Sequence, residues 1–325
     1  MKIVIAEAPE AEGRDLSIER RHLPAGAQVE TFTWRGDRAA LVAACRDAEA
    51  ILTDYVPFDD AVLGQLPRLR LISVTATGWD CVDVAAAAAR GVRVAAVGEY
   101  CTDEVADHTL ALLLALERKL FDYHRQVQDR HSWRWNDVTG IRRLSGRSLG
   151  LVGFGRIGQA VARRARGFGL EILAADPRVD ADTVRHHGAE PVAFEALLAR
   201  ADIVSLHCNL DATNRGLMNR AAFAKMARRP RLINVARGGL VVEADLLEAL
   251  EAGQVAGAAL DVLAEDSPDL GHHPLVGRGD VILTPHVAFY SEAALDDLRR
   301  ISAANIRAFL EGRPGDVFRL VPAAA

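Results

Sequence analysis

Apolar and polar positions along this chain follow two alternating patterns. Short runs rich in β-branched residues, such as Lys2-Ile-Val-Ile-Ala6, alternate with stretches in which apolar residues recur at helical spacing. This alternation is typical of parallel sheets with helices on both faces. Up to residue 100 it predicts helices at 38–45 and 84–89 and strands at 2–6, 28–32, 50–53, 70–75 and 92–95.

A longer helix is predicted to begin at Thr102. We expect Thr102 to be its N-cap, with Asp103 and Glu104 in the first turn, where the helix dipole favours acidic side chains. Because the apolar positions 105, 109, 112, 113, 116 and 120 fall on one face, the helix can continue past Arg118.

A second series of strands follows this helix. After Ser291 a long helix is predicted to about Leu310, and a strand-like run at 317–321 is too short for a third domain, so we expect it to return to the first one. The predicted strands of the second series, which are enough for a complete nucleotide-binding sheet, are 148–153, 171–175, 202–206, 231–235, 257–261 and 281–283.

The order of elements therefore predicts an α/β fold with two doubly wound parallel-sheet domains. One domain is built from residues 1–100 plus 291–325, and the other, residues 101–290, is inserted into it. Short hinges are expected near Tyr100 and Tyr290, because no Pro-rich or low-complexity linker interrupts the chain.

Composition narrows the classes of function. The chain has 325 residues, half of them hydrophobic, which is enough for two cores. The net charge of −5 is mild, and the basic residues are scattered, so neither a nucleic acid nor a membrane surface is an expected partner. The longest apolar run, Leu110 to Leu116, is far shorter than the ~20 residues that span a bilayer.

The cysteines indicate a reducing compartment. All four are far apart in the sequence and none forms a C-x-x-C pair, which favours free thiols in a cytoplasmic protein over disulfides or a zinc site. His272 and His273 are adjacent but lack the spaced partners of a metal site, so we predict no metal.

A glycine-rich motif marks the candidate cofactor site. Gly153-Phe-Gly155-Arg-Ile-Gly158 directly follows a predicted strand and opens a predicted helix, which is the context in which this motif binds a dinucleotide. Gly153 would form the tight turn, Gly155 would let the pyrophosphate approach, and Gly158 would let helix and strand pack closely. The amides of Arg156 and Ile157 would face the phosphates at the positive end of the helix.

Asp176 strengthens this interpretation. It ends the next strand, about 20 residues downstream, where an acidic residue binds the ribose hydroxyls. A carboxylate there repels a 2′-phosphate, so the sequence favours NAD over NADP, although Arg178 follows closely. The competing interpretation is a glycine turn that only joins strand to helix, with Asp176 as a solvated strand-end charge.

Three candidate catalytic groups lie just beyond the carboxyl ends of successive predicted strands: Arg237, an acidic residue of the segment Asp261-Val-Leu-Ala-Glu-Asp266, and His286. These ends face the ligand crevice of a doubly wound sheet. A guanidinium can hold a 2-oxo carboxylate, an imidazole can exchange the alcohol proton, and a carboxylate can orient that imidazole. Each residue also has an ordinary alternative: Arg237 as a phosphate contact, His286 as an exposed loop residue and Asp266 as a turn residue.

Several motifs in order resemble the D-isomer-specific 2-hydroxyacid dehydrogenase family. Asn214 and the segment 287–292 resemble its C-terminal binding protein branch. The matching segments are Gly78-Trp-Asp-Cys-Val-Asp83, Glu104-Val-Ala-Asp107, the glycine motif, His207-Cys-Asn-Leu210, Asn234-Val-Ala-Arg-Gly-Gly239, Gly257-Ala-Ala-Leu-Asp-Val262 and Thr284-Pro-His286.

The resemblance implies a Rossmann cofactor domain inserted into a flavodoxin-like substrate domain. It implies hydride transfer between NAD and a small D-2-hydroxy or 2-oxo acid, with the substrate carboxylate held by Arg237 and the amides of Ala76, Thr77 and Gly78. His286 would be the acid in reduction and the base in oxidation. An aromatic residue at the position of Phe289 would contact the substrate tail. The further predicted cofactor contacts are His207 (on the adenine side), Asn214, Ala236 and Asp261.

One position departs from the family pattern. The family places glutamate where this chain has Asp266, directly after Glu265. We expect Asp266 to partner His286, and Glu265 is the alternative. Because a misplacement of about 1 Å can cost on the order of 10²-fold in rate, an enzyme of low activity is one possible result.

The resemblance also implies a homodimer. Its expected dimer element is the helix from Thr102, whose long apolar face has little to cover it within one subunit. The alternative function is an NAD-responsive dimeric binding protein that acts through partner proteins, like a corepressor, with weak dehydrogenase activity. The retention of Arg237 and His286 favours an enzyme.

Overall fold

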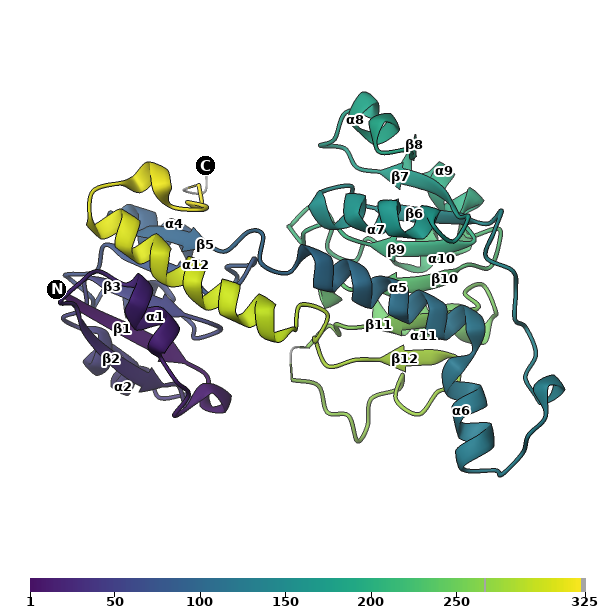
Figure 1. Cartoon of the computed structure of the whole chain (residues 1–325), viewed down its shortest axis with the longest axis horizontal. Coiled ribbons are helices and arrows are strands. Elements are labelled where there is room, and N and C mark those ends of the chain that lie inside the picture. Colours follow the sequence, from purple (N-terminus) through teal and green to yellow (C-terminus); the bar gives the residue numbers. More distant parts are fainter. Residues whose placement is uncertain (266, 323–325) are drawn as a thin grey trace. The chain divides into compact units, whose positions relative to one another are not determined.

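The computed structural model describes residues 1–265 and 267–322. The chain forms two compact units, Met1–Tyr100 with Ser291–Ala325 and Cys101–Tyr290, which we call unit 1 and unit 2 (Figure 1). Both units are parallel-sheet α/β structures, so the predicted fold class is confirmed.

Unit 1 has a five-stranded parallel sheet in the order β2-β1-β3-β4-β5, which is the flavodoxin-like order. Its strands are β1 (Lys2–Glu7), β2 (Gln28–Thr33), β3 (Ala50–Thr53), β4 (Leu71–Val74) and β5 (Arg93–Ala96). Its helices are α1 (Ser17–His22), α2 (Arg38–Cys45), α3 (Asp60–Leu63), α4 (Val84–Ala89) and α12 (Glu292–Leu310), with the short 3₁₀ turns η1 (Pro9–Ala11) and η4 (Pro314–Asp316).

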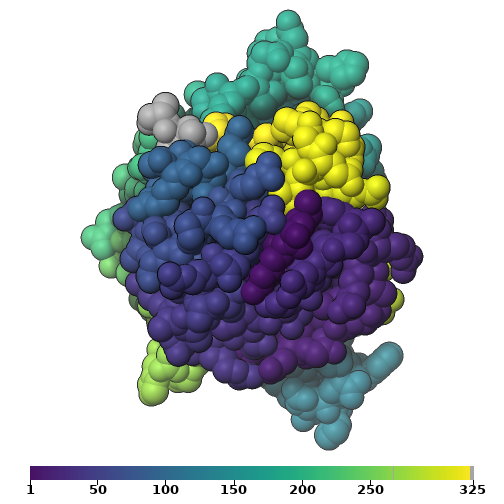
Figure 2. Space-filling model, turned by 90° about the vertical axis from the view of Figure 1, so that its left-hand side faces the viewer, coloured from purple at the N-terminus to yellow at the C-terminus, as the bar shows by residue number. Residues whose placement is uncertain are grey.

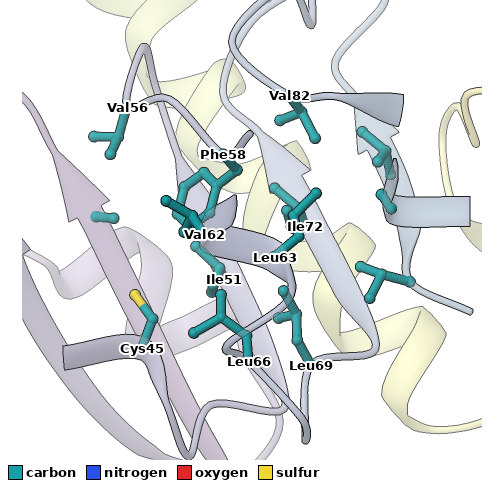
Figure 3. Close-up of a cluster of buried hydrophobic side chains, with 14 of the residues drawn as sticks. Cys45, Ile51, Val56, Phe58, Val62, Leu63, Leu66, Leu69, Ile72 and Val82 are labelled. Carbon is teal, nitrogen blue, oxygen red and sulfur yellow. The ribbon is translucent and has the colours of Figure 1, made fainter. Parts of the chain in front are cut away.

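Two apolar layers cover this sheet, because successive side chains of each strand point to opposite faces. On β1, Val4 and Ala6 join the core shown in Figure 3, where Phe58 and Ile72 are fully buried. Ile3 and Ile5 join the other layer, together with residues of α12.

The C-terminal helix α12 belongs to unit 1, although it is far from the other elements of that unit in sequence. It packs against α1, where Arg299 donates to the fully buried carboxylate of Glu19 at 2.8 and 3.0 Å, and residues from the two ends of the chain lie side by side on the surface in Figure 2. The run at 317–321 returns to unit 1, as expected, but it does not form a strand: its pairing with β5 amounts to one antiparallel bridge between Leu320 and Ala95.

Unit 2 has a seven-stranded parallel sheet in the order β12-β11-β10-β9-β6-β7-β8, one strand more than predicted. Its strands are β6 (Ser148–Val152), β7 (Glu171–Ala175), β8 (Glu190–Pro191), β9 (Ile203–Leu206), β10 (Arg231–Asn234), β11 (Gly257–Leu260) and β12 (Val281–Leu283). Its helices are α5 (Thr102–Arg118), α6 (Leu120–Gln128), α7 (Arg156–Arg166), α8 (Ala181–His186), α9 (Phe194–Arg200), α10 (Arg220–Ala224) and α11 (Glu243–Glu251), with the turns η2 (Trp135–Asp137) and η3 (Gly238–Leu240).

Helix α5 corrects three expectations. It begins at Thr102, so Cys101 is the N-cap residue and Thr102 is not. It ends at Arg118. The left-handed φ of 56° at the C-cap residue Lys119 separates α5 from α6, so Leu120 leaves the predicted apolar face and is half exposed. That face is covered within unit 2 by α7, β10 and β11, so it is not left free for a second subunit.

The described residues contain no helix long and apolar enough to cross a membrane. The same residues hold no group of three or more His, Cys, Asp or Glu side chains that could bind a metal ion. All four cysteines are free.

Candidate functional site

The predicted site residues of unit 2 follow the carboxyl ends of its strands, and parallel strands bring these ends to one edge of the sheet. Backbone hydrogen bonds continue past the strands there. The amide of Asp261 donates to Asn234 at 2.9 Å, and the amide of His286 donates to Asp261 at 2.7 Å. The segments that carry Arg237, Asp261 and His286 are therefore neighbours.

Each glycine of the motif meets the geometric need predicted for it. Gly153 has a left-handed φ of 94°, and a Cβ on it would lie 2.6 Å from the amide nitrogen of Cys208. A Cβ on Gly158 would lie 2.5 Å from the carbonyl oxygen of Gly153, whereas nothing lies within 4 Å of a Cβ on Gly155. The loop is thus tightly packed on two sides and open at Gly155.

Helix α7 starts directly after this opening. Gly155 is its N-cap residue, so no side chain caps the helix, and the amides of Arg156 and Ile157 belong to its first turn. Amides at the positive end of a helix suit a pyrophosphate, so these residues fit a dinucleotide.

Asp176 lies beside the loop. One oxygen of its carboxylate accepts from the amide of Phe154 at 2.7 Å, and the other accepts from the amide of Arg178 at 2.8 Å. The guanidinium of Arg178 pairs with Asp211 at 2.9 Å, so a carboxylate already offsets the cation that weakened the preference for NAD.

His207 lies under the glycine loop, with its Cβ 3.9 Å from the position of a Cβ on Gly158. Nε2 and the Ser205 hydroxyl form a hydrogen bond of 2.9 Å, while the buried Nδ1 has no partner among the described residues. Burial lowers the pKa of His207 to about 3, so the ring is neutral near pH 7 and unsuited to proton transfer there.

Asn214 braces a loop. Its side-chain oxygen accepts from the amide of Asp211 at 2.8 Å, and its nitrogen donates to the carbonyl of Asn209 at 2.6 Å. Its predicted contact with the cofactor stays a prediction.

The carboxylate of Asp261 organises the loop that carries His286. It is 1% exposed and accepts from the Thr284 hydroxyl at 2.6 Å and from the amides of Val287 and Ala288, both at 2.9 Å. His286 sits between these bonds with a left-handed φ of 51°, a conformation that is uncommon for a residue other than glycine. The buried carboxylate of Asp261 therefore fixes the conformation of the Thr284–Ala288 loop through these hydrogen bonds.

Arg237 is half-buried in the loop after β10. Its Nη1 donates to the carbonyl of Ala236 at 2.8 Å, and its own carbonyl accepts from the Asn234 side chain at 2.9 Å. Across residues 1–265 and 267–322, no carboxylate pairs with its guanidinium. A cation held without a counter-charge can receive an anionic substrate.

The Arg237 loop touches the segment that leads to Glu265. A Cβ on Gly238 would lie 1.7 Å from the carbonyl oxygen of Leu263, so only glycine allows this approach. Glu243 holds the same segment by accepting from the amide of Ala264 at 2.7 Å. Glu265 is exposed, and Asp266 lies outside the described residues.

Phe289 lies against His286. Their rings meet edge to face with centroids 6.1 Å apart. An aromatic side chain therefore lies next to the candidate acid–base residue, as a contact to a substrate tail requires.

In unit 1, Ala76, Thr77 and Gly78 follow β4. The carbonyl of Ala76 accepts from the amide of Val97 at 2.9 Å, whereas the three amides of this loop donate to no acceptor within the described chain. Successive free amides are a suitable site for a carboxylate.

Sequence reasoning missed two supporting groups. His108 on α5 lies 3.2 Å from the Thr284 hydroxyl, which itself donates to Asp261. Glu243 also lies 3.3 Å from His273, which ties that loop histidine to α11. Neither His108 nor Glu243 belongs to a sequence motif that would reveal its role, because the partners of both residues are at least 21 positions away in sequence.

Comparison with known proteins gives one family. Residues 110–288 match the family model described as "D-isomer specific 2-hydroxyacid dehydrogenase, NAD binding domain". Hydroxypyruvate reductase of Blautia hydrogenotrophica is 32% identical, covering 98% of this chain and 99% of its own. Glycerate dehydrogenase of Methylorubrum extorquens is 33% identical, covering 94% and 96%.

A solved structure agrees over the full length. The TT0316 protein of Thermus thermophilus superposes with a TM-score of 0.86 at 32% identity, covering 99% of this chain and 100% of its own.

The neutral His207 predicts a pH dependence of stability. Its folded pKa of about 3 is below the ordinary 6.5, so the unfolded chain binds more protons below pH 6.5 and the fold loses stability as pH falls. Relative to His207→Gln, the wild type should lose about 1.4 kcal/mol of unfolding free energy per pH unit in this range. Urea denaturation followed by circular dichroism measures both curves, and parallel curves would contradict the prediction.

Proposed function

We propose that this chain, which belongs to the D-isomer specific 2-hydroxyacid dehydrogenase family, uses Arg237 and His286 to reduce a small 2-oxo acid or oxidise the matching D-2-hydroxy acid. It is an NAD-dependent oxidoreductase. The observation that carries the catalytic assignment is the His286 loop, held in a left-handed conformation by the buried carboxylate of Asp261.

His286 moves the proton. It donates to the carbonyl oxygen during reduction and accepts from the hydroxyl during oxidation, and a carboxylate on its other nitrogen would orient the ring. We assign this carboxylate to Asp266 from its place in the sequence. The exposure of Glu265 supports the choice.

Arg237 holds the substrate carboxylate. Its guanidinium has no carboxylate partner within the described chain, and a planar fork of donors matches a carboxylate in two parallel hydrogen bonds. From the sequence, the amides of Ala76, Thr77 and Gly78 in unit 1 are also assigned to substrate binding, and they donate to no acceptor within the described chain. Fixing the acid group orients the carbon that reacts.

The glycine loop and the first turn of α7 would hold the pyrophosphate of NAD, and Asp176 would hold the ribose hydroxyls. When bound, the nicotinamide supplies or accepts the hydride. Asp176 already accepts from two amides, which fixes its carboxylate beside the loop. His207, Asn214, Ala236 and Asp261 are assigned as further contacts to the cofactor.

The substrate is proposed to be a short 2-oxo acid of the size of hydroxypyruvate or glyoxylate. Relatives with these substrates in their names support the size: hydroxypyruvate reductase, glycerate dehydrogenase and a glyoxylate reductase of Korarchaeum cryptofilum that is 36% identical. Phe289, beside His286, would contact the tail and admit acids larger than glyoxylate.

Within the family, we assign the chain to the C-terminal binding protein-like branch. Asn214 and the segment 287–292 support this assignment, and Phe289 stands in that segment. The branch suggests a second candidate function, an NAD-responsive protein that acts through partner proteins.

We also propose a homodimer formed by the segment 120–137 of each subunit. This segment, α6 with the loop and turn that follow, exposes Trp133 at 89%, Trp135 at 84% and Phe121 at 52%, which is unusual for large apolar side chains that stay in water. On the same unit, Leu116, Phe121 and Leu283 help to line a cavity of about 260 Å³ that can receive an aromatic side chain from a second copy. The dispersed free cysteines suit a cytoplasmic location.

The first experiment follows NADH oxidation by absorbance with glyoxylate, hydroxypyruvate, pyruvate, phenylpyruvate and branched 2-oxo acids. We expect His286→Asn, which tolerates the left-handed backbone, to lower kcat by about 10²–10⁴-fold. Arg237→Ala should lower kcat/KM at least about a hundredfold, because a charge-assisted pair is lost. His272→Ala and Arg143→Ala, at exposed positions, are the matched controls.

Turnover that survives both site variants would contradict the catalytic assignment. Tight NADH binding without turnover of any acid would favour the NAD-responsive binding protein.

The shorter carboxylate at position 266 predicts a gain of activity. If Asp266 holds His286 loosely, Asp266→Glu should raise kcat up to about tenfold, because the longer side chain restores the partner's position. Steady-state kinetics with the best acid of the panel measures this change. An unchanged or lower kcat would contradict the hypothesis that Asp266 is a weaker partner of His286 than glutamate would be.

Removing the exposed indoles should weaken the dimer. We expect the double variant Trp133→Ser/Trp135→Ser to raise the dimer dissociation constant at least about tenfold in sedimentation experiments, since aromatic side chains dominate interfaces. Phe168→Ser, at another exposed apolar position, is the control. A wild-type monomer, or a dimer that the double variant leaves unchanged, would overturn the proposal.

A further inference from the structure

Unit 2 also has a cavity at the amino ends of its strands, opposite the edge that carries Arg237 and His286. Arg147 directly precedes β6, Arg231 begins β10 and Ala256 directly precedes β11. The cavity has a volume of about 150 Å³, and its lining is Glu117, Gly140, Arg142, Arg147, Arg229, Arg231 and Ala256.

Positive charge dominates the lining. Four guanidinium groups face one carboxylate, Glu117, which is 1% exposed and accepts from Arg147 at 2.6 Å. Nε of Arg231 lies 3.7 Å from the other oxygen of Glu117. Asp202 is shared between Arg147 and Arg228, which lies outside the lining, so it offsets little of the charge in the cavity.

Two of these arginines, Arg147 and Arg231, are largely withdrawn from water, whereas Arg142 and Arg229 are exposed. Arg231 is 8% exposed. Burial lowers its pKa, the charge of Glu117 raises it, the charges of Arg142 and Arg147 lower it, and that of Asp280, outside the lining, raises it. Arginine stays charged under these conditions. Buried cations without enough counter-charge are costly, so an anion in this cavity would be bound favourably.

The backbone makes room for these side chains. A Cβ on Gly253 would lie 2.9 Å from Nη2 of Arg229, and a Cβ on Gly257 would lie 2.5 Å from Nη1 of Arg231. Arg229 itself has a left-handed φ of 50°, where glycine would be less strained. Arg229 is thus present at a position where the backbone favours glycine. Gly253 and Gly257 are present where a larger residue would clash with the side chains of Arg229 and Arg231.

We propose that this cavity binds the phosphate group of a small molecule. A dianionic phosphate balances most of the net charge of the lining, and its oxygens match the donor forks of arginines. The volume equals that of about five water molecules, which suits one tetrahedral oxyanion. The remainder of a phosphate ester would extend past Arg142 and Arg229, which are exposed.

The test is calorimetric titration of the full chain with inorganic phosphate and, separately, with glycerol 3-phosphate. Saturating NAD is present throughout, so that the pyrophosphate site of the glycine loop is filled, and ionic strength is held constant. We expect saturable binding of one phosphate per chain. Tighter binding of glycerol 3-phosphate would identify an organic ester as the ligand, and equal binding would identify free phosphate.

Two variants locate the site. Arg142→Gln should weaken phosphate binding at least about tenfold, whereas Arg143→Gln, an adjacent exposed arginine outside the lining, should leave it unchanged. Arg229→Gly should also weaken binding. The variant loses the hydrogen bond from Arg229 Nε to the carbonyl of Gly253 at 2.6 Å, but glycine relieves the left-handed backbone, so the melting temperature without phosphate should change little. A purely structural arginine would instead lower the melting temperature.

Three results would overturn the proposal: no saturable phosphate binding, binding that neither Arg142→Gln nor Arg229→Gly weakens, and tighter binding of citrate than of either phosphate. These outcomes are independent of dehydrogenase activity, so the proposed function can hold or fail separately.

Discussion

The parallel pairing of β10, β11 and β12 is the constraint on which the candidate active site depends. Each strand delivers its next residues to the same edge of the sheet, and the ladder continues beyond the strands through the amides of Asp261 and His286. Residues that are 49 positions apart in sequence, Arg237 and His286, are thereby carried on neighbouring segments. The proposed chemistry requires this arrangement, because Arg237 is proposed to hold the substrate acid while His286 exchanges the proton.

A single buried carboxylate then refines the site. Asp261 is held at the end of β11 and satisfies three donors of the Thr284–Ala288 loop, which offsets the cost of burying its charge. The same bonds hold His286 in a backbone conformation that it would not choose alone. The buried carboxylate of Asp261 therefore positions the His286 loop by the same hydrogen bonds that offset its own loss of hydration. His108 links this group of hydrogen bonds to helix α5, because it lies 3.2 Å from the Thr284 hydroxyl.

Both edges of the unit 2 sheet carry groups that favour anions, but the groups differ in kind. The carboxyl edge carries the glycine loop, in which nothing lies within 4 Å of a Cβ on Gly155. Beside this loop is the amino end of α7 with its amides. The same edge carries Arg237, whose guanidinium has no carboxylate partner in the described chain. At the amino edge, four arginines line a cavity that holds one buried carboxylate, Glu117, which pairs with Arg147 and Arg231. Strands β6, β10 and β11 run from one edge to the other. The arginine-lined cavity therefore lies at one end of these strands, and the candidate active site lies at the other end.

The sequence by itself determined the alternation of strands and helices and the glycine loop, and it singled out Arg237 and His286 as candidates, because these features depend on local periodicity and on short motifs. It misjudged α5 and the 317–321 segment, since the cover of an apolar face and the pairing of a short strand depend on distant elements. Only the tertiary structure decided that Asp261 holds the His286 loop, that His207 is neutral, and that Glu117 gathers arginines from separate loops. Burial and hydrogen bonding are properties of neighbours in space, and in this chain those neighbours are tens of residues apart in sequence.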